Sequence, residues 1–456
     1  MADSSQFECL VLYGRRRVGK TYLMLELLKD RPGMYFAFEQ QSAPTLLAKF
    51  SEHVLRTFPS PYISSFGTYE QAFLYLRDQI GSNPFVLALD EFQYIAMQDH
   101  AFLSMLQNMI DHHWQKTGML LILCGSYMSF MESEVLGAKS PIFGRRTASI
   151  KLEPLRFSEA KGLLSGYDNL DAFTAWSIAG GMPLYLQQFR TSAGIRENIL
   201  NNVLAKGSLL YNEPVFALKQ ELREPNLYFS ILEGISTGKT KYNEITSSIG
   251  TEAGYYLNNL IALGIVRREM PFGEKDNGRR GIYRLCDPFF TFYFRFISRY
   301  NSLVESEKHE LLWDQVIEPS MPEYLGHRFE DLCGEQLDEW NGTPSLPFLF
   351  TGKGRWWGTN PQTRSQEEID WVASDGKDQV LVAECKWRRT PVTEQDVNKL
   401  IDRSALMPQT SRHLFLFSRS GTNHQAWKIA DAHHIKQLTF QDIGDVLWRI
   451  EDIEKE

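Results

Sequence analysis

The chain has 456 residues, enough for two to four domains, and its hydrophobic content of 43% and charged content of 23% are ordinary for globular protein. No apolar run approaches the roughly 20 residues of a membrane helix, the first residues lack the basic and apolar segments of a signal peptide, and the net charge of −8 excludes a surface that is basic throughout. The five cysteines form no C-x-x-C pair, so neither a disulfide framework nor a zinc site is indicated, and we expect a cytoplasmic protein without a membrane partner.

Residues 10–22 carry the strongest motif. An apolar run ending at Tyr13 precedes Gly14, four further residues and then Gly19, Lys20 and Thr21, which is the spacing of a phosphate-binding loop. Glycines let the backbone N–H groups face phosphate, Lys20 adds positive charge at the β- and γ-phosphates, and Thr21 offers a hydroxyl to Mg²⁺. The alternative is a plain turn, but the flanking strand and the helix over 22–29 favour phosphate. The expected nucleotide-binding residues are Gly14, Arg15, Arg16, Arg17, Val18, Gly19, Lys20, Thr21 and Tyr22.

A short strand over 34–38 and helices over 43–57 and 69–80 lead to a second element of this site. The apolar run over residues 85–89 ends in Asp90 and Glu91, as expected of a buried parallel strand. Ligands of open parallel sheets bind where the strands end, which is also where the phosphate loop lies. We expect Asp90 to hold Mg²⁺ with Thr21, and Glu91 to orient or deprotonate the attacking water. The alternative for both acids is a solvated strand end or a helix cap.

Two further candidates follow the next apolar strand, residues 119–124. Ser126 can reach between the acids and the γ-phosphate as a sensor, although a helix N-cap is an equally good interpretation. Arg145 and Arg146 precede a fifth strand over 148–152. One of them, Arg145 before Arg146, could be an arginine finger that stabilises transition-state charge, within its own chain or in a neighbouring one; a solvated turn is the alternative.

These motifs together resemble the archaeal-type ATPase family, a branch of the AAA+ and STAND P-loop ATPases. The resemblance rests on residues 14–21, 89–91, 124–126, 143–146 and the Ala-Gly-Gly-Met-Pro-Leu-Tyr-Leu stretch at 179–186. It implies a five-stranded parallel sheet, a helical lid over 153–215 and ATP as the ligand. Members of this family carry an N-terminal segment that helps to hold adenine. Only nine residues precede Leu10 here, so we expect adenine to be held in another way.

Residues 225–300 differ in charge from the remainder of the chain. They contain ten Lys and Arg against seven Asp and Glu, a balance of +3 that leaves −11 for the rest. The sequence predicts the order of a winged helix-turn-helix, with helices over 227–235, 242–249 and 254–263 and strands over 265–269 and 281–285. We weigh DNA contact, with Lys275, Arg279 and Arg280 of the wing on phosphates, equally against a packing role. The aromatic run over 289–300 is expected to pack.

The last third holds a second set of charged candidates. Residues 368–373 and 380–387 predict a hairpin, and Glu384 and Lys386 are two residues apart on one strand, so they share a face. Asp370 lies on the partner strand, and Glu330 belongs to a helix over 324–337 that precedes a loop around 352–361. Carboxylates that converge with a lysine suit a metal-activated water. We expect Asp370, Glu384 and Glu330 to hold Mg²⁺ or Mn²⁺ and Lys386 to position the water.

This portion resembles the PD-(D/E)xK nuclease superfamily, and in particular the C-terminal domain that accompanies archaeal-type ATPases. The resemblance rests on Asp370, on Glu384-Cys-Lys386 and on the Gly-Arg-Trp-Trp-Gly stretch at 354–358, with a helix over 393–406 and a strand over 413–417 following in αβββαβ order. Two alternatives stay open: a charged strand that only forms salt bridges, and a nuclease fold that binds but no longer cleaves.

The sequence therefore predicts an α/β chain of four parts: a P-loop ATPase core (1–152), a helical lid (153–215), a winged helix-turn-helix (225–300) and a PD-(D/E)xK nuclease-like domain (320–456). We expect ATP or ADP with Mg²⁺ at the first site, and ATP hydrolysis that controls a DNA-binding, metal-dependent nuclease-like domain. The alternative is a regulatory or scaffold ATPase with a catalytically silent nuclease fold. A homo-oligomer follows if Arg145 acts on a neighbouring copy.

Overall fold

The computed structural model describes residues 6–99, 101–222, 225–275 and 280–443. The chain divides into two compact units, of which the first comprises residues 1–154 with 182–184 and the second comprises 155–181 and 185–456. The wing residue Arg279 lies outside the described residues. Within the described ranges, no helix combines the length and the apolar character needed to cross a membrane.

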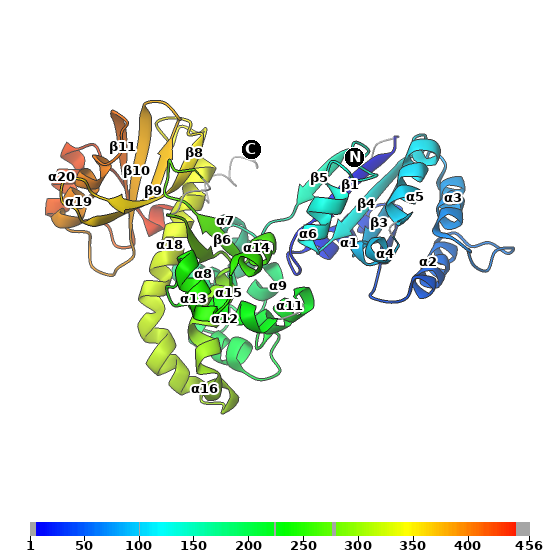
Figure 1. Ribbon diagram of the computed structural model, residues 1–456, viewed down its shortest axis with the longest axis horizontal. Coiled ribbons are helices and arrows are strands. Elements are labelled where there is room, and N and C mark those ends of the chain that lie inside the picture. Colours follow the sequence, from blue (N-terminus) through cyan, green and yellow to red (C-terminus); the bar gives the residue numbers. More distant parts are fainter. Residues whose placement is uncertain (1–5, 100, 223–224, 276–279, 444–456) are drawn as a thin grey trace. The chain divides into compact units, whose positions relative to one another are not determined.

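The first unit is built on a parallel sheet of five strands (Figure 1). Their order across the sheet is β2-β3-β4-β1-β5, and every neighbouring pair is parallel. This confirms the five-stranded parallel sheet that the resemblance implies. The strands are β1 (Glu8–Tyr13), β2 (Gly33–Ala37), β3 (Phe85–Asp90), β4 (Met119–Gly125) and β5 (Ala148–Lys151).

Alternating side chains of these strands bury both faces of the sheet. Leu87 and Leu89 of β3 belong to one core cluster, whereas Val86 and Ala88 belong to another. This period of two explains why β3 is apolar without interruption. The first cluster is covered by α2 (Ala43–Thr57), α3 (Tyr69–Ile80), α4 (Gln93–Gln98) and α5 (Ala101–Met109), and the second is covered by α1 (Lys20–Lys29).

The second unit begins with short helices and continues into a three-helix module. The module consists of α12, α13 and α14, followed by the antiparallel strands β6 and β7, so the predicted order of elements is present. The helices of the unit up to α18 are α7 (Phe157–Ala160), α8 (Asn169–Ala179), α10 (Ile195–Asn198), α11 (Glu213–Glu221), α12 (Pro225–Ser236), α13 (Tyr242–Ile249), α14 (Gly254–Ala262), α15 (Pro288–Phe292), α16 (Asn301–Glu305), α17 (His309–Leu312) and α18 (Glu318–Trp340). The two strands are β6 (Val266–Glu269) and β7 (Ile282–Leu285).

The second sheet has five strands of mixed direction in the order β12-β11-β10-β9-β8. We expected a loop around residues 352–361, and this was wrong, because that stretch forms the edge strand β8. Its glycines lower its local preference for a strand, but pairing with β9 makes it one. The elements are β8 (Gly352–Thr359), β9 (Gln366–Ser374), β10 (Gln379–Lys386), α19 (Glu394–Ser404), β11 (Ser411–Ser418), α20 (His424–Ala432) and β12 (Lys436–Thr439).

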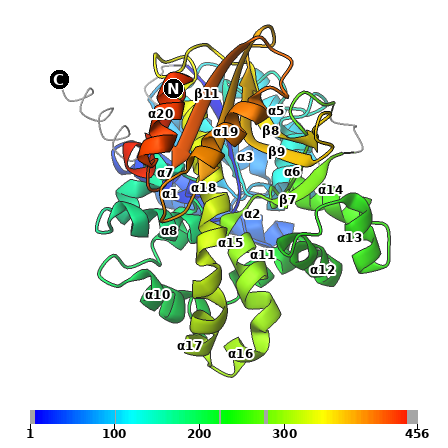
Figure 2. The same ribbon diagram turned by 90° about the vertical axis from the view of Figure 1, so that its left-hand side faces the viewer.

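Helices cover both faces of this sheet. Val380 and Val382 of β10 pack in a core cluster with α19 and α20, which lie together beside β11 (Figure 2). The long helix α18 packs against the sheet through Trp371 of β9, whose indole N–H donates to the carbonyl of Glu330 at 2.6 Å. A Cβ atom added at Gly334 of α18 would lie 2.3 Å from the ring of Trp371. The helix therefore approaches this rigid indole as closely as it does because residue 334 has no side chain.

We predict that Gly334→Ala destabilises the protein by about 1–3 kcal/mol, because the indole cannot yield without losing its hydrogen bond. The matched control is Gly326→Ala on the same helix, where an added Cβ would meet only a side-chain carbon at 3.8 Å. There the better helix propensity of alanine should give a gain of up to about 1 kcal/mol. Urea denaturation of the full chain measures both, and equal effects would contradict the close packing of α18.

Candidate functional site

The phosphate loop lies between β1 and α1, at the edge of the first sheet where the parallel strands end. Gly14 is pressed against the residue that follows β5: an added Cβ would lie 2.4 Å from the carbonyl oxygen of Leu152. Gly19 has φ 106° and stands directly before the first residue of α1. Both positions require glycine, because one lacks space for a side chain and the other has a left-handed backbone. The backbone N–H groups of the loop and of the first turn of α1 are thereby available to an anion.

Lys20 is buried, with 5% of its surface exposed, and its ammonium group turns back into the loop. Nζ donates to the carbonyl oxygens of Gly14 at 2.8 Å and Arg15 at 3.0 Å. Burial lowers its pKa, while the neighbouring carboxylates of Glu91 and Asp90 act in the opposite direction. The lysine is therefore held at the loop by carbonyl groups, which a phosphate could replace as partners.

Thr21 and Asp90 lie side by side, as the sequence predicts. The hydroxyl of Thr21 donates to Oδ2 of Asp90 at 2.7 Å, and Tyr35 of β2 donates to the same oxygen at 2.9 Å. Tyr35 was not predicted, because it has no motif and reaches Asp90 only through the pairing of β2 with β3. The arrangement places a hydroxyl and a carboxylate, both hard oxygen ligands, beside the phosphate loop.

Glu91 follows β3 in a left-handed conformation, with φ 48°. Ser126, which comes directly after β4, donates its hydroxyl to Oε2 of Glu91 at 2.7 Å, and the amide of Gln93 donates to the same oxygen. The structure thus brings the candidate sensor and the candidate base together. Gln93 is a further member that sequence reasoning missed, since an amide two residues after an acid carries no recognisable signal.

The other loop residues differ in exposure. Val18 is buried, Arg15, Arg16 and Arg17 are half-buried, and the side chain of Tyr22 on α1 is 65% exposed. Arg16 donates to the hydroxyl of Tyr94 at 2.9 Å, which ties the loop to α4.

Arg145 lies at the opposite edge of the sheet from the phosphate loop. Its guanidinium donates to both carboxylate oxygens of Asp111 at 2.6 and 2.8 Å, and Asp111 precedes β4 just as Arg145 precedes β5. The strand β1, six residues or about 20 Å long, separates that edge from the loop. The expectation that Arg145 could reach the phosphates of its own chain is therefore wrong. Arg146 also stays local, donating to the carbonyl of Leu136 at 3.1 Å.

The second set of charged residues lies on the sheet of the second unit. Glu384 is buried, and its carboxylate accepts hydrogen bonds from Lys386 of the same strand and from Arg403 of α19, the latter at 3.0 and 3.1 Å. Burial disfavours the charge of Lys386, but Glu384 and Asp370 outweigh it and raise the lysine pKa. Arg403 was not predicted, because only the packing of α19 on β10 brings its side chain to Glu384.

Asp370 lies in a β-bulge. Between the pairs Gly354–Val372 and Trp356–Ile369 the register shifts, so that Arg355 of β8 faces both Asp370 and Trp371 of β9. The carboxylate of Asp370 accepts a hydrogen bond from the backbone N–H of Cys385 at 2.7 Å. Burial raises the pKa of Asp370 well above its ordinary value, and the nearby carboxylates of Glu384 and Glu330 raise it further.

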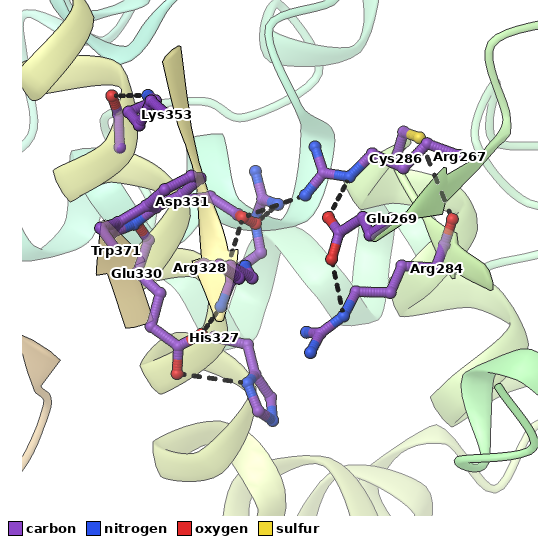
Figure 3. Close-up of polar contacts among 12 residues, drawn as sticks. Arg267, Glu269, Arg284, Cys286, His327, Arg328, Glu330, Asp331, Lys353 and Trp371 are labelled. Carbon is purple, nitrogen blue, oxygen red and sulfur yellow. Dashed lines mark hydrogen bonds and ion pairs between the residues drawn. The ribbon is translucent and has the colours of Figure 1, made fainter. Parts of the chain in front are cut away.

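Glu330 does not complete a three-carboxylate site. Its side chain is paired with Arg355 and, at 3.5 Å, with His327. Figure 3 shows the contact with His327. In the part of the chain that the structure describes, no group of three or more His, Cys, Asp or Glu side chains is arranged to hold a metal ion. The expected convergence of Glu330 with Asp370 and Glu384 as three metal ligands is therefore not observed: Glu330 lies near enough to raise the pKa of Asp370, but its carboxylate pairs with Arg355.

A parallel sheet with a Gly-rich loop, a buried lysine, and a threonine, an aspartate and a glutamate at its strand ends defines a P-loop ATPase. The chain belongs to the archaeal-type ATPase family: residues 1–189 match the model of an "ATPase domain predominantly from Archaea". Residues 293–400 match a second family, described as archaeal and bacterial proteins of unknown function.

Two relatives come from Methanocaldococcus jannaschii. The uncharacterized protein MJECL04 is 32% identical over 403 residues, which is 87% of this chain and 86% of that protein. The uncharacterized protein MJ0424 is 44% identical over 54 residues, 12% of this chain and 52% of that protein. The similarity to MJECL04 thus extends over most of the chain.

The solved structures that this chain matches include two proteins, from Pyrococcus abyssi and Aeropyrum pernix. The Walker-type ATPase PABY2304 of Pyrococcus abyssi covers 63% of this chain and 91% of its own, with 20% identity and a TM-score of 0.46. The ORC2 protein of Aeropyrum pernix, in ADPNP and ADP complexes, covers 66% of this chain and 89% of its own, with 13% identity and a TM-score of 0.39.

Proposed function

We propose that this ATPase binds and hydrolyses ATP at the strand ends of the first sheet. The observation that carries the proposal is the chain of contacts from the phosphate loop to the acids: Lys20 in the loop, Thr21 on Asp90, and Ser126 on Glu91. The loop N–H groups and Lys20 bind the phosphates, and Lys20 exchanges its carbonyl partners for phosphate oxygens.

Mg²⁺ fits the pair formed by Thr21 and Asp90, because a hydroxyl and a carboxylate oxygen 2.7 Å apart are the ligands that this ion takes beside phosphates. Bound there, the ion would supply positive charge to the β- and γ-phosphates. Glu91 orients the attacking water and accepts its proton. Ser126 and Gln93 position the Glu91 carboxylate through their hydrogen bonds. An arginine-finger role for Arg145 belongs to a second copy of the chain, and in that form we keep it as part of the proposal.

Lys20→Ala should weaken ATP binding by about 100-fold, because it removes a charged hydrogen-bond donor from the phosphates. Lys29→Ala, an exposed lysine at the end of the same helix, is the matched control and should bind normally. Isothermal titration with ATP and Mg²⁺ measures both variants. Unchanged affinity in Lys20→Ala would overturn the assignment of the loop.

Glu91→Gln should bind ATP with near-normal affinity but hydrolyse it about 100- to 10,000-fold more slowly, because glutamine cannot accept the proton from water. Single-turnover release of phosphate gives the rate, and equilibrium titration gives the affinity. A second variant, Ser126→Ala, should reduce turnover less, since it loosens the carboxylate without removing it. Normal hydrolysis by Glu91→Gln would remove this residue from the role of base.

We further propose that the second unit contains a metal-dependent, nuclease-like centre at Asp370, Glu384 and Lys386, whose access to DNA is controlled by the nucleotide state. The supporting observation is geometric: Asp370 of β9 accepts from the backbone N–H of Cys385 at 2.7 Å, and Glu384 and Lys386 flank Cys385 on β10 and contact each other. The raised pKa of Asp370, caused by burial and then by the nearby carboxylates, agrees with it. A divalent cation would relieve this excess of negative charge, so the residues fit Mg²⁺ or Mn²⁺ held by Asp370 and Glu384. Lys386 positions the water.

A second candidate function is a regulatory or scaffold ATPase whose nuclease-like fold is catalytically silent. Arg403 favours it, because its guanidinium already neutralises Glu384 together with Lys386. The module of α12, α13 and α14 also favours this second candidate, because its contacts suit packing inside the unit. Its basic strand residues Arg267 and Arg284 pair with acids inside the unit, and the N–H of Phe272 donates to the carbonyl of Arg355 at 2.7 Å. We assign the winged helix-turn-helix to domain packing.

Incubation of the full chain with duplex and single-stranded DNA, Mg²⁺ or Mn²⁺, with and without ATP, separates these two candidates. Cleavage by the wild type that is lost in Lys386→Ala supports the nuclease-like centre, with a fall of about 100-fold or more. Lys428→Ala, an exposed lysine on α20, is the control and should cleave normally. Absence of cleavage under every condition selects the silent fold.

A further inference from the structure

A cavity of about 500 Å³ lies within the second unit, and its lining includes none of Asp370, Glu384 and Lys386. Its size falls in the range of small-molecule and cofactor sites. Ile235 of α12, Leu285 of β7 and Tyr324 of α18 supply apolar wall. The charged side chains that line it are Arg267, Arg284, Arg295, Arg299, His327, Arg328, Arg355, Glu323 and Asp331. Six arginines therefore face two carboxylates.

The arginines converge from different elements onto one space. Arg267 comes from β6, Arg284 from β7, Arg328 from α18 and Arg355 from β8. Proteins usually bind a nucleic-acid backbone with a stripe of basic residues along their surface, whereas arginines that face into one cavity suit a compact anion. The geometry therefore favours a small ligand over an extended strand.

Carboxylates pair with five of these six arginines, but they leave several N–H donors of the guanidinium groups over. Asp331 is shared by three arginines: Arg328 at 2.6 Å and Arg267 at 3.7 Å, both labelled in Figure 3, and Arg355 at 3.0 Å. Burial would raise the pKa of Asp331, yet these three guanidinium groups hold it below its ordinary value. Arg267 also pairs with Glu269, and Arg355 also pairs with Glu330. Each guanidinium carries five N–H donors, so these contacts occupy only part of them.

Further donors remain without acceptors. The Nε–H groups of Arg328 and Arg355 are buried and make no hydrogen bond within the part of the chain that the structure describes. Arg299 is exposed and has no ion-pair partner among those same residues, whereas Arg295 pairs only with the exposed Glu323 at 2.9 Å. Phosphate oxygens match such planar, forked donors in geometry and in charge.

We propose that this cavity binds a small ligand with at least two phosphate groups, of the class of a nucleoside diphosphate, separately from the phosphate loop. The oxyanions accept from the arginines of β6, β8 and α18, and Arg299 contacts the part of the ligand nearest to solvent. The apolar wall formed by Ile235, Leu285 and Tyr324 receives the organic part.

The test uses the full chain carrying Lys20→Ala, so that the phosphate loop no longer competes. Pyrophosphate and ADP are titrated at low salt by calorimetry, and we expect one of each bound per chain. Adding Arg299→Ala should weaken both by about tenfold, because one charged hydrogen bond is lost. Arg190→Ala, an exposed arginine of the same unit outside the cavity, is the matched control and should leave binding unchanged. Thermal melting verifies that each variant is folded.

Failure of the Lys20→Ala chain to bind both pyrophosphate and ADP would overturn the proposal. Binding that Arg299→Ala leaves unchanged would also overturn it, because the anion would then lie elsewhere. A single-stranded oligonucleotide that binds in an Arg299-dependent way, while both small ligands fail, would assign the cavity to nucleic-acid phosphate and overturn the small-ligand class. None of these outcomes depends on whether the phosphate loop hydrolyses ATP.

Discussion

The first unit depends on the burial of one ammonium group beside two carboxylates. Lys20 is removed from water and donates to the carbonyls of its own loop, and the acids at the end of β3 lie near enough to oppose the effect of burial on its pKa. This arrangement requires that Gly14 touch the carbonyl of Leu152, so that the loop can close above the sheet. Every other feature of the site, from the turn at Gly19 to the pair of Thr21 and Asp90, follows from holding that charge in place.

The second unit contains the opposite arrangement, a buried negative charge among positive ones. There the buried carboxylate of Asp331 is surrounded by guanidinium groups, and the neighbouring Glu330 is taken by Arg355. Buried ion pairs add little net stability, because desolvation offsets their attraction. Such pairs instead determine which elements pack together. This cluster joins β6, β8 and α18, and so holds the three-helix module against the sheet. Carboxylates inside the unit also neutralise several of the basic residues of 225–300, so the positive balance of that segment does not require an external acidic partner.

Local sequence could reveal most of the first site and only part of the second. Backbone geometry within one loop fixes the spacing of Gly14, Gly19, Lys20 and Thr21. The apolar run before Asp90 is itself typical of a buried strand. Both elements could therefore be predicted from the sequence. The contacts of Arg403 with Glu384 and of Arg355 with Glu330 could not be predicted, because only tertiary packing brings these side chains together. The strand β8 was mistaken for a loop because glycines weaken its local preference, although pairing with β9 overrides it. Action of Arg145 within its own chain was left open, although a residue that precedes a parallel strand lies at the edge opposite to the phosphate loop.

The bulge in β9 has a consequence for the coupling of sites. Arg355 stands opposite the two bulged residues, so its backbone shares the ladder with Asp370 while its side chain reaches Glu330, Asp331 and the arginine-lined cavity. Any ligand that draws this guanidinium away from Glu330 changes the electrostatic environment of Asp370, whose pKa depends on Glu330. Thermodynamic linkage is reciprocal: a cation held at Asp370 must alter the affinity of the cavity by the same factor. Arg355 is thus the residue through which the proposed cavity ligand and the proposed cation would affect each other.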